Sequence, residues 1–218
     1  MKKYFFIVPA ILYSATFLSA QPDKSKYPDP EFANEVSYLK KDSANTIIRL
    51  EKGSSKMDTK IKMGGFGGTE SGYEIEGEKS PVRLKSGSNL SFIFSTGASA
   101  RSSSSTAMRD SMMRANGMDP SMMQSMTDPS NMISLYKAET GKDKRKILMQ
   151  KSPGASPFGS KKMQSGDKFT FSVKQIREGY WELVIDKPLS KGEYAFTMMN
   201  MGMGNMDGSS LLFAFAVD

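Results

Sequence analysis

The sequence of 218 residues contains neither cysteine nor histidine. The two absences exclude a disulfide, a cysteine-held iron–sulfur cluster, a histidine-held haem, the usual zinc sites, and nucleophiles of the Ser-His-Asp or Cys-His kind. Carboxylates, lysine, tyrosine and serine remain for chemistry, and no pair of them is marked by its spacing. We therefore expect a protein that is not an enzyme. A glycosidase-type pair of carboxylates, distant from each other in the sequence, stays open as the alternative.

The N-terminus has the layout of a secretory signal peptide. Two lysines after Met1 precede an apolar run from Tyr4 to Leu18, and Ser19-Ala20 offers a small-residue cleavage point. We expect residues 1–20 to be removed and the mature protein to reach the periplasm, the cell surface or the medium. An uncleaved membrane anchor is the alternative, although the run contains Pro9 and is shorter than the ~20 residues of a spanning helix. No later segment is apolar enough to span a membrane, so no transmembrane segment is expected after cleavage.

The rest of the chain favours a single all-β domain. Residues 21–32 are polar, hold three prolines and predict an irregular lead-in. Residues 33–218 consist of short runs with alternating or β-rich composition, which predict ten to twelve strands and an antiparallel β-sandwich, immunoglobulin-like or related. An N-terminal β-hairpin unit followed by a domain that starts near Ser71 is the alternative. The strand runs are Val36–Lys40, Asn45–Glu51, Met57–Met63, Tyr73–Glu76, Val82–Lys85, Leu90–Ser95, Ile133–Ala138, Lys144–Gln150, Lys168–Lys174, Tyr180–Asp186, Glu193–Met198 and Leu211–Val217.

Alternation and turn residues give finer expectations. Thr140–Asp143 predicts a hairpin, with similar turns at 177–179 and 190–192. The basic run Lys142–Lys146 at the first hairpin indicates a solvated strand edge, which discourages aggregation, and we expect no nucleic-acid partner. Two consecutive strands should point aromatic and aliphatic side chains into the core. Those side chains are Phe169, Phe171, Val173, Trp181, Leu183 and Ile185.

One long interval, residues 96–131, carries no strand signal and is rich in Ser, Gly and Met. Loops longer than ~12–15 residues are uncommon inside a compact domain. We predict that this interval is a flexible Ser/Met-rich insertion outside the core, with a short helix within residues 106–115.

The chain from Gly77 onwards resembles a loose group of uncharacterised exported bacterial proteins. The matching motifs are an early G-x-x-S-x-V-R strand, here Gly77 to Arg83, a GEYAF strand, here Gly192 to Phe196, and a closing F-x-F-x-V-D strand, here Phe213 to Asp218. The resemblance implies a β-sandwich and supplies no catalytic residues. Asp42-Ser43-Ala44 is in addition similar to the acceptor of protein O-glycosylation in Bacteroidetes.

The 18 methionines are concentrated in two stretches. Seven lie within residues 96–131 and five lie within residues 198–206. Thioethers are soft ligands that select Cu(I), and by the same softness Ag(I), over hard cations. The sequence therefore predicts a candidate soft-metal site, although methionine also serves as an adaptable apolar filler or contact surface. The candidate ligands are Met112, Met122, Met199, Met201 and Met203.

Two functions follow from these patterns. The first is an exported, non-catalytic β-sandwich module without a cofactor, which contacts an unknown protein or envelope ligand. The second is a periplasmic protein that binds Cu(I) or Ag(I) through its methionine-rich stretches.

Overall fold

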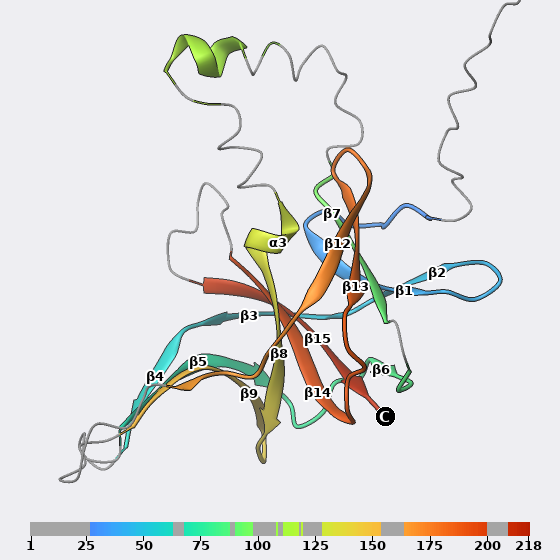
Figure 1. Ribbon diagram of the computed structural model, residues 1–218. Coiled ribbons are helices and arrows are strands. Elements are labelled where there is room, and N and C mark those ends of the chain that lie inside the picture. Colours follow the sequence, from blue (N-terminus) through green and yellow to red (C-terminus); the bar gives the residue numbers. More distant parts are fainter. Residues whose placement is uncertain are drawn as a thin grey trace, which may run out of the picture.

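The structure is a computed structural model that describes residues 27–62, 68–87, 90–97, 108, 111–117, 119, 128–153, 164–199 and 209–218. Two β-sheets pack face to face, as Figure 1 shows. Sheet A has the order β12 (Phe171–Arg177), β13 (Tyr180–Ile185), β7 (Ser91–Ser95), β1 (Glu35–Lys40) and β2 (Thr46–Arg49). Sheet B has the order β3 (Glu51–Lys56), β15 (Ser209–Val217), β14 (Gly192–Met199), β8 (Ile133–Thr140), β9 (Lys144–Ser152), β5 (Thr69–Glu76) and β4 (Asp58–Ile61).

Three short strands and one helical turn complete the described elements. β10 (Gln164–Ser165) pairs with β9, β11 (Lys168–Phe169) pairs with β8, and β6 (Arg83–Leu84) runs parallel to β15. The turn α3 (Pro129–Met132) is capped by the Asp128 side chain, which accepts a hydrogen bond from the Ser130 amide. The other pairings are antiparallel, so the expected all-β, antiparallel, sandwich-like architecture is confirmed.

Each predicted run contains a strand, and β3 and β10 are strands that the patterns did not indicate. The sequence of β3, EKGSSK, has no branched or aromatic residue, and the strand forms because its neighbour β15 is strongly apolar. The predicted short helix agrees with residues 108 and 111–115, which are helical.

The space between the sheets is filled with aromatic side chains. Phe92 of sheet A lies 4.9 Å from Phe196 and 5.0 Å from Phe215 of sheet B, measured between ring centroids. Such tilted and edge-on pairs add about 0.5–1.5 kcal/mol each beyond the area they bury. The predicted inward residues are confirmed, because they all lie in or against this core: Phe169, Phe171, Val173, Trp181, Leu183 and Ile185.

Two predicted strands turn out to cross from one sheet to the other. The run Lys168–Lys174 divides at Thr170, since β11 pairs with sheet B and β12 pairs with sheet A. The run Asn45–Glu51 divides at Leu50 in the same way, between β2 and β3. Strands that bend from one sheet into the other form the corners of packed sheets. The turn at 190–192 is likewise not a hairpin turn, because it joins β13 of sheet A to β14 of sheet B. The other two predicted turns do connect paired neighbours.

Sheet B is a strongly curled half-barrel. Its two edge strands, β3 and β4, follow each other in the chain with only Met57 between them. One run of chain therefore pairs with β15 through its first half and with β5 through its second half. The Glu74 amide also donates to Ser55 Oγ at 3.1 Å, which ties β5 to β3 directly.

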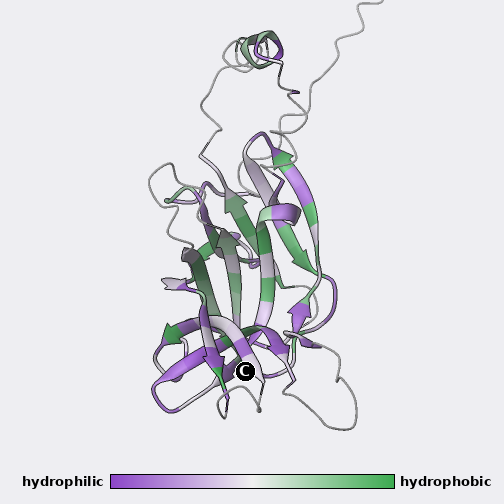
Figure 2. Cartoon of the chain, turned by 90° about the vertical axis from the view of Figure 1, so that its left-hand side faces the viewer, coloured by the Kyte–Doolittle hydropathy of each residue, from purple (hydrophilic) through white to green (hydrophobic). Residues whose placement is uncertain are grey.

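The inside of the curl holds a second, smaller core. Alternation along the strands turns one set of side chains toward the aromatic core and the other set into the curl. Three of the inner residues are alanines, and small side chains of this kind allow a tight curl. The inner residues are Tyr73, Ile75, Tyr136, Ala138, Ile147, Ala195, Leu212 and Ala214. Figure 2 shows that hydrophilic residues are frequent in the strands at the lower end of the view, while hydrophobic residues are concentrated in the strands above them.

Arg145 of β9 closes one end of this inner core and is only 1% exposed. The expectation that Lys142–Lys146 is wholly a solvated edge is thus wrong at this residue. Arg145 lies on the same inward face as Ile147, two positions later. Its guanidinium donates hydrogen bonds to protein oxygens in place of water. Both terminal nitrogens donate to the Glu51 carboxylate, at 2.8 and 2.6 Å. Nε donates to the Gly77 carbonyl at 3.0 Å and Nη2 to the Glu76 carbonyl at 2.9 Å.

We predict that Arg145→Ala lowers the free energy of unfolding by about 3–5 kcal/mol, because the substitution leaves the Glu51 carboxylate partly buried without its partner. Arg145→Lys should restore only part of the loss, since an ammonium cannot supply the same fork of donors. Denaturant unfolding measures the effect. The control is Arg83→Ala, which removes the exposed pair with Asp218 and should cost less than about 1 kcal/mol. Equal losses in Arg145→Ala and the control would contradict the prediction.

Candidate functional site

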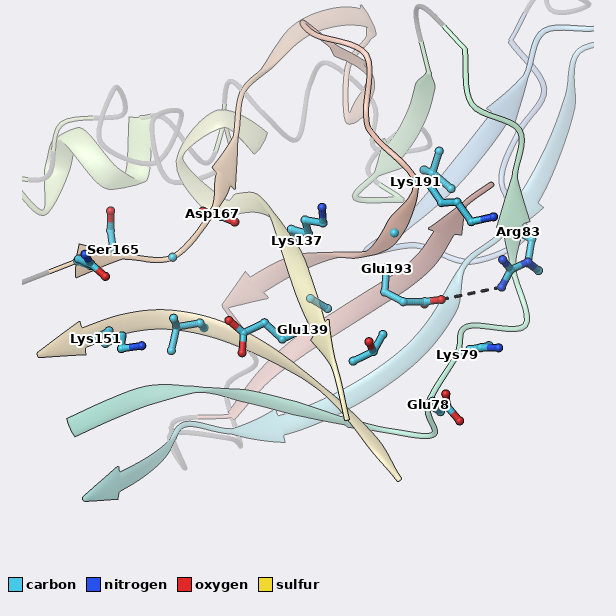
Figure 3. Close-up of a pocket in the computed structure, with 17 residues that line it drawn as sticks. Glu78, Lys79, Arg83, Lys137, Glu139, Lys151, Ser165, Asp167, Lys191 and Glu193 are labelled. Atoms are coloured by element: carbon cyan, nitrogen blue, oxygen red, sulfur yellow. Dashed lines mark ion pairs between the residues drawn. The ribbon is translucent and has the colours of Figure 1, made fainter. Parts of the chain in front are cut away.

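A cavity of about 760 Å³ opens beside the buried Arg145 network. Its walls come from six separate segments of the chain, most of which carry a labelled side chain in Figure 3. These are the turn that leads into β6, the end of β8, the second half of β9, the segment from β10 to β11, the start of β14 and the end of β15. Most of the lining side chains are polar or charged, and Val217, Ala138 and Leu148 supply the apolar part.

A tight turn at Gly166 fixes one wall of the cavity. The Gly166 amide donates to the Met149 carbonyl at 3.0 Å, and the Lys137 amide donates to the Asp167 carbonyl at 3.1 Å. A Cβ atom at position 166 would lie 1.6 Å from the Leu148 carbonyl oxygen, so only glycine permits this approach. The turn is therefore held against both β8 and β9, and it carries Asp167 at a defined place on the rim.

Three of the charged lining residues are already paired. Arg83 binds the carboxylate of Asp218 in a two-pronged contact. Glu193 accepts a hydrogen bond from the Ser80 amide at 2.9 Å and lies 3.5 Å from the Arg145 guanidinium. Lys151 lies 3.2 Å from Glu70. These groups form the fixed, neutralised part of the lining.

The remaining charged side chains of the lining form no ion pair within the described part of the chain, although Lys191 lies close enough to Asp218 to help Arg83 lower the pKa of that carboxyl group. Lys137 donates only to the hydroxyl of Ser190, at 3.3 Å. Five other lining side chains take part in no hydrogen bond or ion pair among the described residues. They are Glu78, Lys79, Glu139, Asp167 and Lys191. Groups of both signs thus remain available to a ligand.

Glu70, next to the cavity wall, is held ionised by three lysines, one directly after β4 and two on β9. Lys62 donates to it at 2.6 Å, and Lys151 and Lys146 lie 3.2 and 3.5 Å away. The hydrogen bond from Lys62, followed by the contact with Lys151, lowers the pKa of Glu70 to about 2 against the opposing effect of burial. Lys151 is therefore committed to structure rather than free for a ligand.

Two further buried carboxylates lie on the outer face of sheet A. Glu35 binds Arg49 and Lys52, at 2.7 and 2.8 Å. Glu182 binds Lys41 at 2.8 Å and accepts from the Tyr27 hydroxyl at 2.9 Å. Burial opposes ionisation of both groups, yet these contacts hold their pKa values below the ordinary range. The ion pairs fasten the lead-in and the β2–β3 corner to sheet A, which is a structural role.

The structure places the predicted methionine ligands only in part. Met112 lies in the helical residues 111–115 and is 68% exposed, and Met199 is the last residue of β14. Met122, Met201 and Met203 lie outside the described residues. The chain leaves β14 for the second methionine-rich stretch beside the point where the insertion returns to β8, because Met198 pairs with Ile133.

The described residues contain no group of three or more acidic side chains that could hold a metal ion. None of the helices in this part of the chain has the length and apolar character that a bilayer span requires. Comparison with protein-family models, with curated proteins and with solved structures finds no match for this chain. Function must therefore be inferred from the residues themselves.

Sequence reasoning missed the cavity because its residues are scattered over about 140 positions, from Glu78 to Val217. Only two local signals were available. The alternation in Lys144–Leu148 puts Arg145 on the same face as Ile147, and Gly166-Asp167 marks a turn. Neither signal shows that the six wall segments meet.

We predict that Glu70→Gln lowers the free energy of unfolding at neutral pH by about 1 kcal/mol, because three lysines lose a charged partner. The pKa of Glu70 is lowered on folding, so its ionisation contributes stability above the ordinary value of 4.5, and the contribution disappears as the pH falls toward about 2. Unfolding of wild type and variant should therefore converge between pH 5 and pH 2. A difference that is independent of pH over this range would contradict the assignment.

Proposed function

We propose that this protein is an exported, non-catalytic binding module, built on an immunoglobulin-like or related sandwich, that takes its ligand in the charged cavity of sheet B. One observation carries the proposal. Among the residues that the structure describes, lysine and carboxylate side chains that form no ion pair line a cavity of about 760 Å³, while neighbouring charges are paired. Unpaired charges of this kind are available for recognition at no loss of internal contacts.

The surroundings of the cavity support this proposal. Strands β8, β9, β14 and β15 all contribute to the walls, and the Gly166 turn is hydrogen bonded to β8 and β9, which holds the lining in place before a ligand arrives. A preformed site loses less free energy to ordering when it binds. The signal-peptide layout of residues 1–20 favours a site in the periplasm, at the cell surface or in the medium.

We expect at least one compound from a panel of amino acids, short peptides, carboxylates, phosphates and saccharides to raise the melting temperature by about 2–8 °C at saturating concentration. Thr140→Trp, which places an indole in the cavity, should abolish the shift. Thr59→Trp is the matched control, since Thr59 is an exposed strand residue of β4 that does not line the cavity. A panel without any stabilising compound, or a shift that survives Thr140→Trp, would overturn the proposal.

A second candidate function is binding of Cu(I) or Ag(I) by the methionines. The observation that favours it is the register of β8 and β14. The insertion rejoins the sheet at Ile133, opposite Met198, so two methionine-rich stretches more than 60 residues apart are anchored on adjacent strands. Neutral thioethers need no deprotonation to act as ligands, unlike cysteine or histidine.

We predict that the protein withdraws Cu(I) from a competing chelator and that the triple variant Met199→Leu, Met201→Leu and Met203→Leu does so at least tenfold less well. Leucine keeps the apolar volume and removes the sulfur. Met57→Leu, at an exposed position outside the two methionine-rich stretches, is the control and should bind as wild type does. Equally weak binding by all three proteins would mean that the methionines are filler or a contact surface.

A further inference from the structure

The free charges of the cavity are separated by sign. Figure 3 places Lys191 and Lys79 at one end, next to Arg83, and it places Glu139 and Asp167 on the other side of Lys137. We call the group of Lys79 and Lys191 the cationic end and the pair Glu139 and Asp167 the acidic side.

Paired groups around each end do not cancel this separation. At the cationic end, the guanidinium of Arg83 is occupied by Asp218, and the Glu193 carboxylate is occupied by Ser80 and Arg145. Glu78 is the one carboxylate without a hydrogen bond or ion pair at this end among the described residues. The two lysines outnumber it, and the Asp218 carboxylate, which Lys191 also influences, is bound by Arg83. On the acidic side, Lys137 is the nearest free cation in the described part of the chain, and the two carboxylates outnumber it.

We propose that the cavity binds a zwitterionic ligand, a short peptide or amino-acid derivative, with its carboxylate at Lys191 and Lys79 and its ammonium group at Glu139 and Asp167. The proposal rests on the proposed binding function of this cavity. A ligand with charge of one sign meets attraction at one end and repulsion at the other, because like charges placed together cost free energy. A ligand that carries both charges, separated along its length, gains at both ends.

The size of the cavity is consistent with such a ligand. Pockets of about 300–1,000 Å³ enclose small organic molecules, and the cavity volume of about 760 Å³ falls within this range. The apolar lining residues Val217, Ala138 and Leu148 can contact the uncharged atoms of such a ligand.

Three tripeptides test the charge requirement directly. Triglycine carries both charges, N-acetyl-triglycine carries only the carboxylate, and triglycine amide carries only the ammonium group. Calorimetric titration at low ionic strength should show that each singly charged peptide binds about fivefold or more weaker than triglycine, as expected for exposed charge pairs in dilute salt.

Two substitutions assign the ends. Lys191→Met should remove the difference between triglycine and triglycine amide, because the carboxylate then has lost a main partner. Glu139→Gln should reduce the difference between triglycine and N-acetyl-triglycine in the same way. Lys174→Met and Glu178→Gln, at exposed positions of the β12–β13 hairpin in sheet A, are the matched controls and should leave all three affinities unchanged.

The outcomes separate this inference from the function on which it rests. If N-acetyl-triglycine or triglycine amide binds as tightly as triglycine, the zwitterion rule is wrong while the cavity remains a binding site. If no tripeptide binds and another compound of the panel does so in a Thr140→Trp-sensitive way, the ligand class is wrong and the module function stands. If nothing binds in the cavity, both proposals fail.

Discussion

The structure depends on one buried interaction, the guanidinium of Arg145. A buried arginine loses its hydration, and this loss is recovered only when each donor finds a well-placed acceptor. Here the acceptors are Glu51 at the start of β3 and the carbonyls of Glu76 and Gly77 at the end of β5, and Glu193 of β14 adds an ion pair at 3.5 Å. Strands that are distant in sequence are thereby held at one end of the curl.

The same network determines the shape of the candidate site. Glu193 faces Arg145 with one oxygen and Arg83 with the other, at 3.5 and 3.9 Å, and both Glu193 and Arg83 line the cavity. The ion-paired side chains largely cancel each other's charge. The lysines and carboxylates that form no ion pair therefore determine the charge pattern that a ligand meets. Glu193 therefore belongs both to the buried network that stabilises the fold and to the wall of the proposed binding site.

The sequence predicted the elements better than it predicted their assembly. Period-two alternation located the strands and the inward aromatic residues, because burial of one face imposes that period. Sequence patterns did not predict the polar strand β3, because its conformation is imposed by pairing with β15 rather than by its own residues. The crossings at Leu50 and Thr170 escaped for a related reason. A strand that changes sheets keeps its alternation, and only the pairing partners reveal the change.

Residue chemistry alone also directed attention to the methionines and away from the cavity. Methionine enrichment is visible in the sequence itself, whereas Lys79, Glu139 and Lys191 are ordinary surface residues until the fold brings them together. Arg145 differs from these residues, because the alternation along its strand places it on the same face as the apolar Ile147. A buried charge within a basic run is a signal of an internal network rather than of a solvated edge.

The most direct test of the central claim is a double-mutant cycle between Arg145 and Glu51. The free energy of unfolding is measured for wild type, Arg145→Met, Glu51→Gln and the double variant. If the buried pair organises sheet B, the two single losses should together exceed the loss of the double variant, with a coupling energy of about 1.5–3 kcal/mol. Losses that add to within about 0.5 kcal/mol would show that Arg145 and Glu51 act independently, and the organising role of the buried pair would be contradicted.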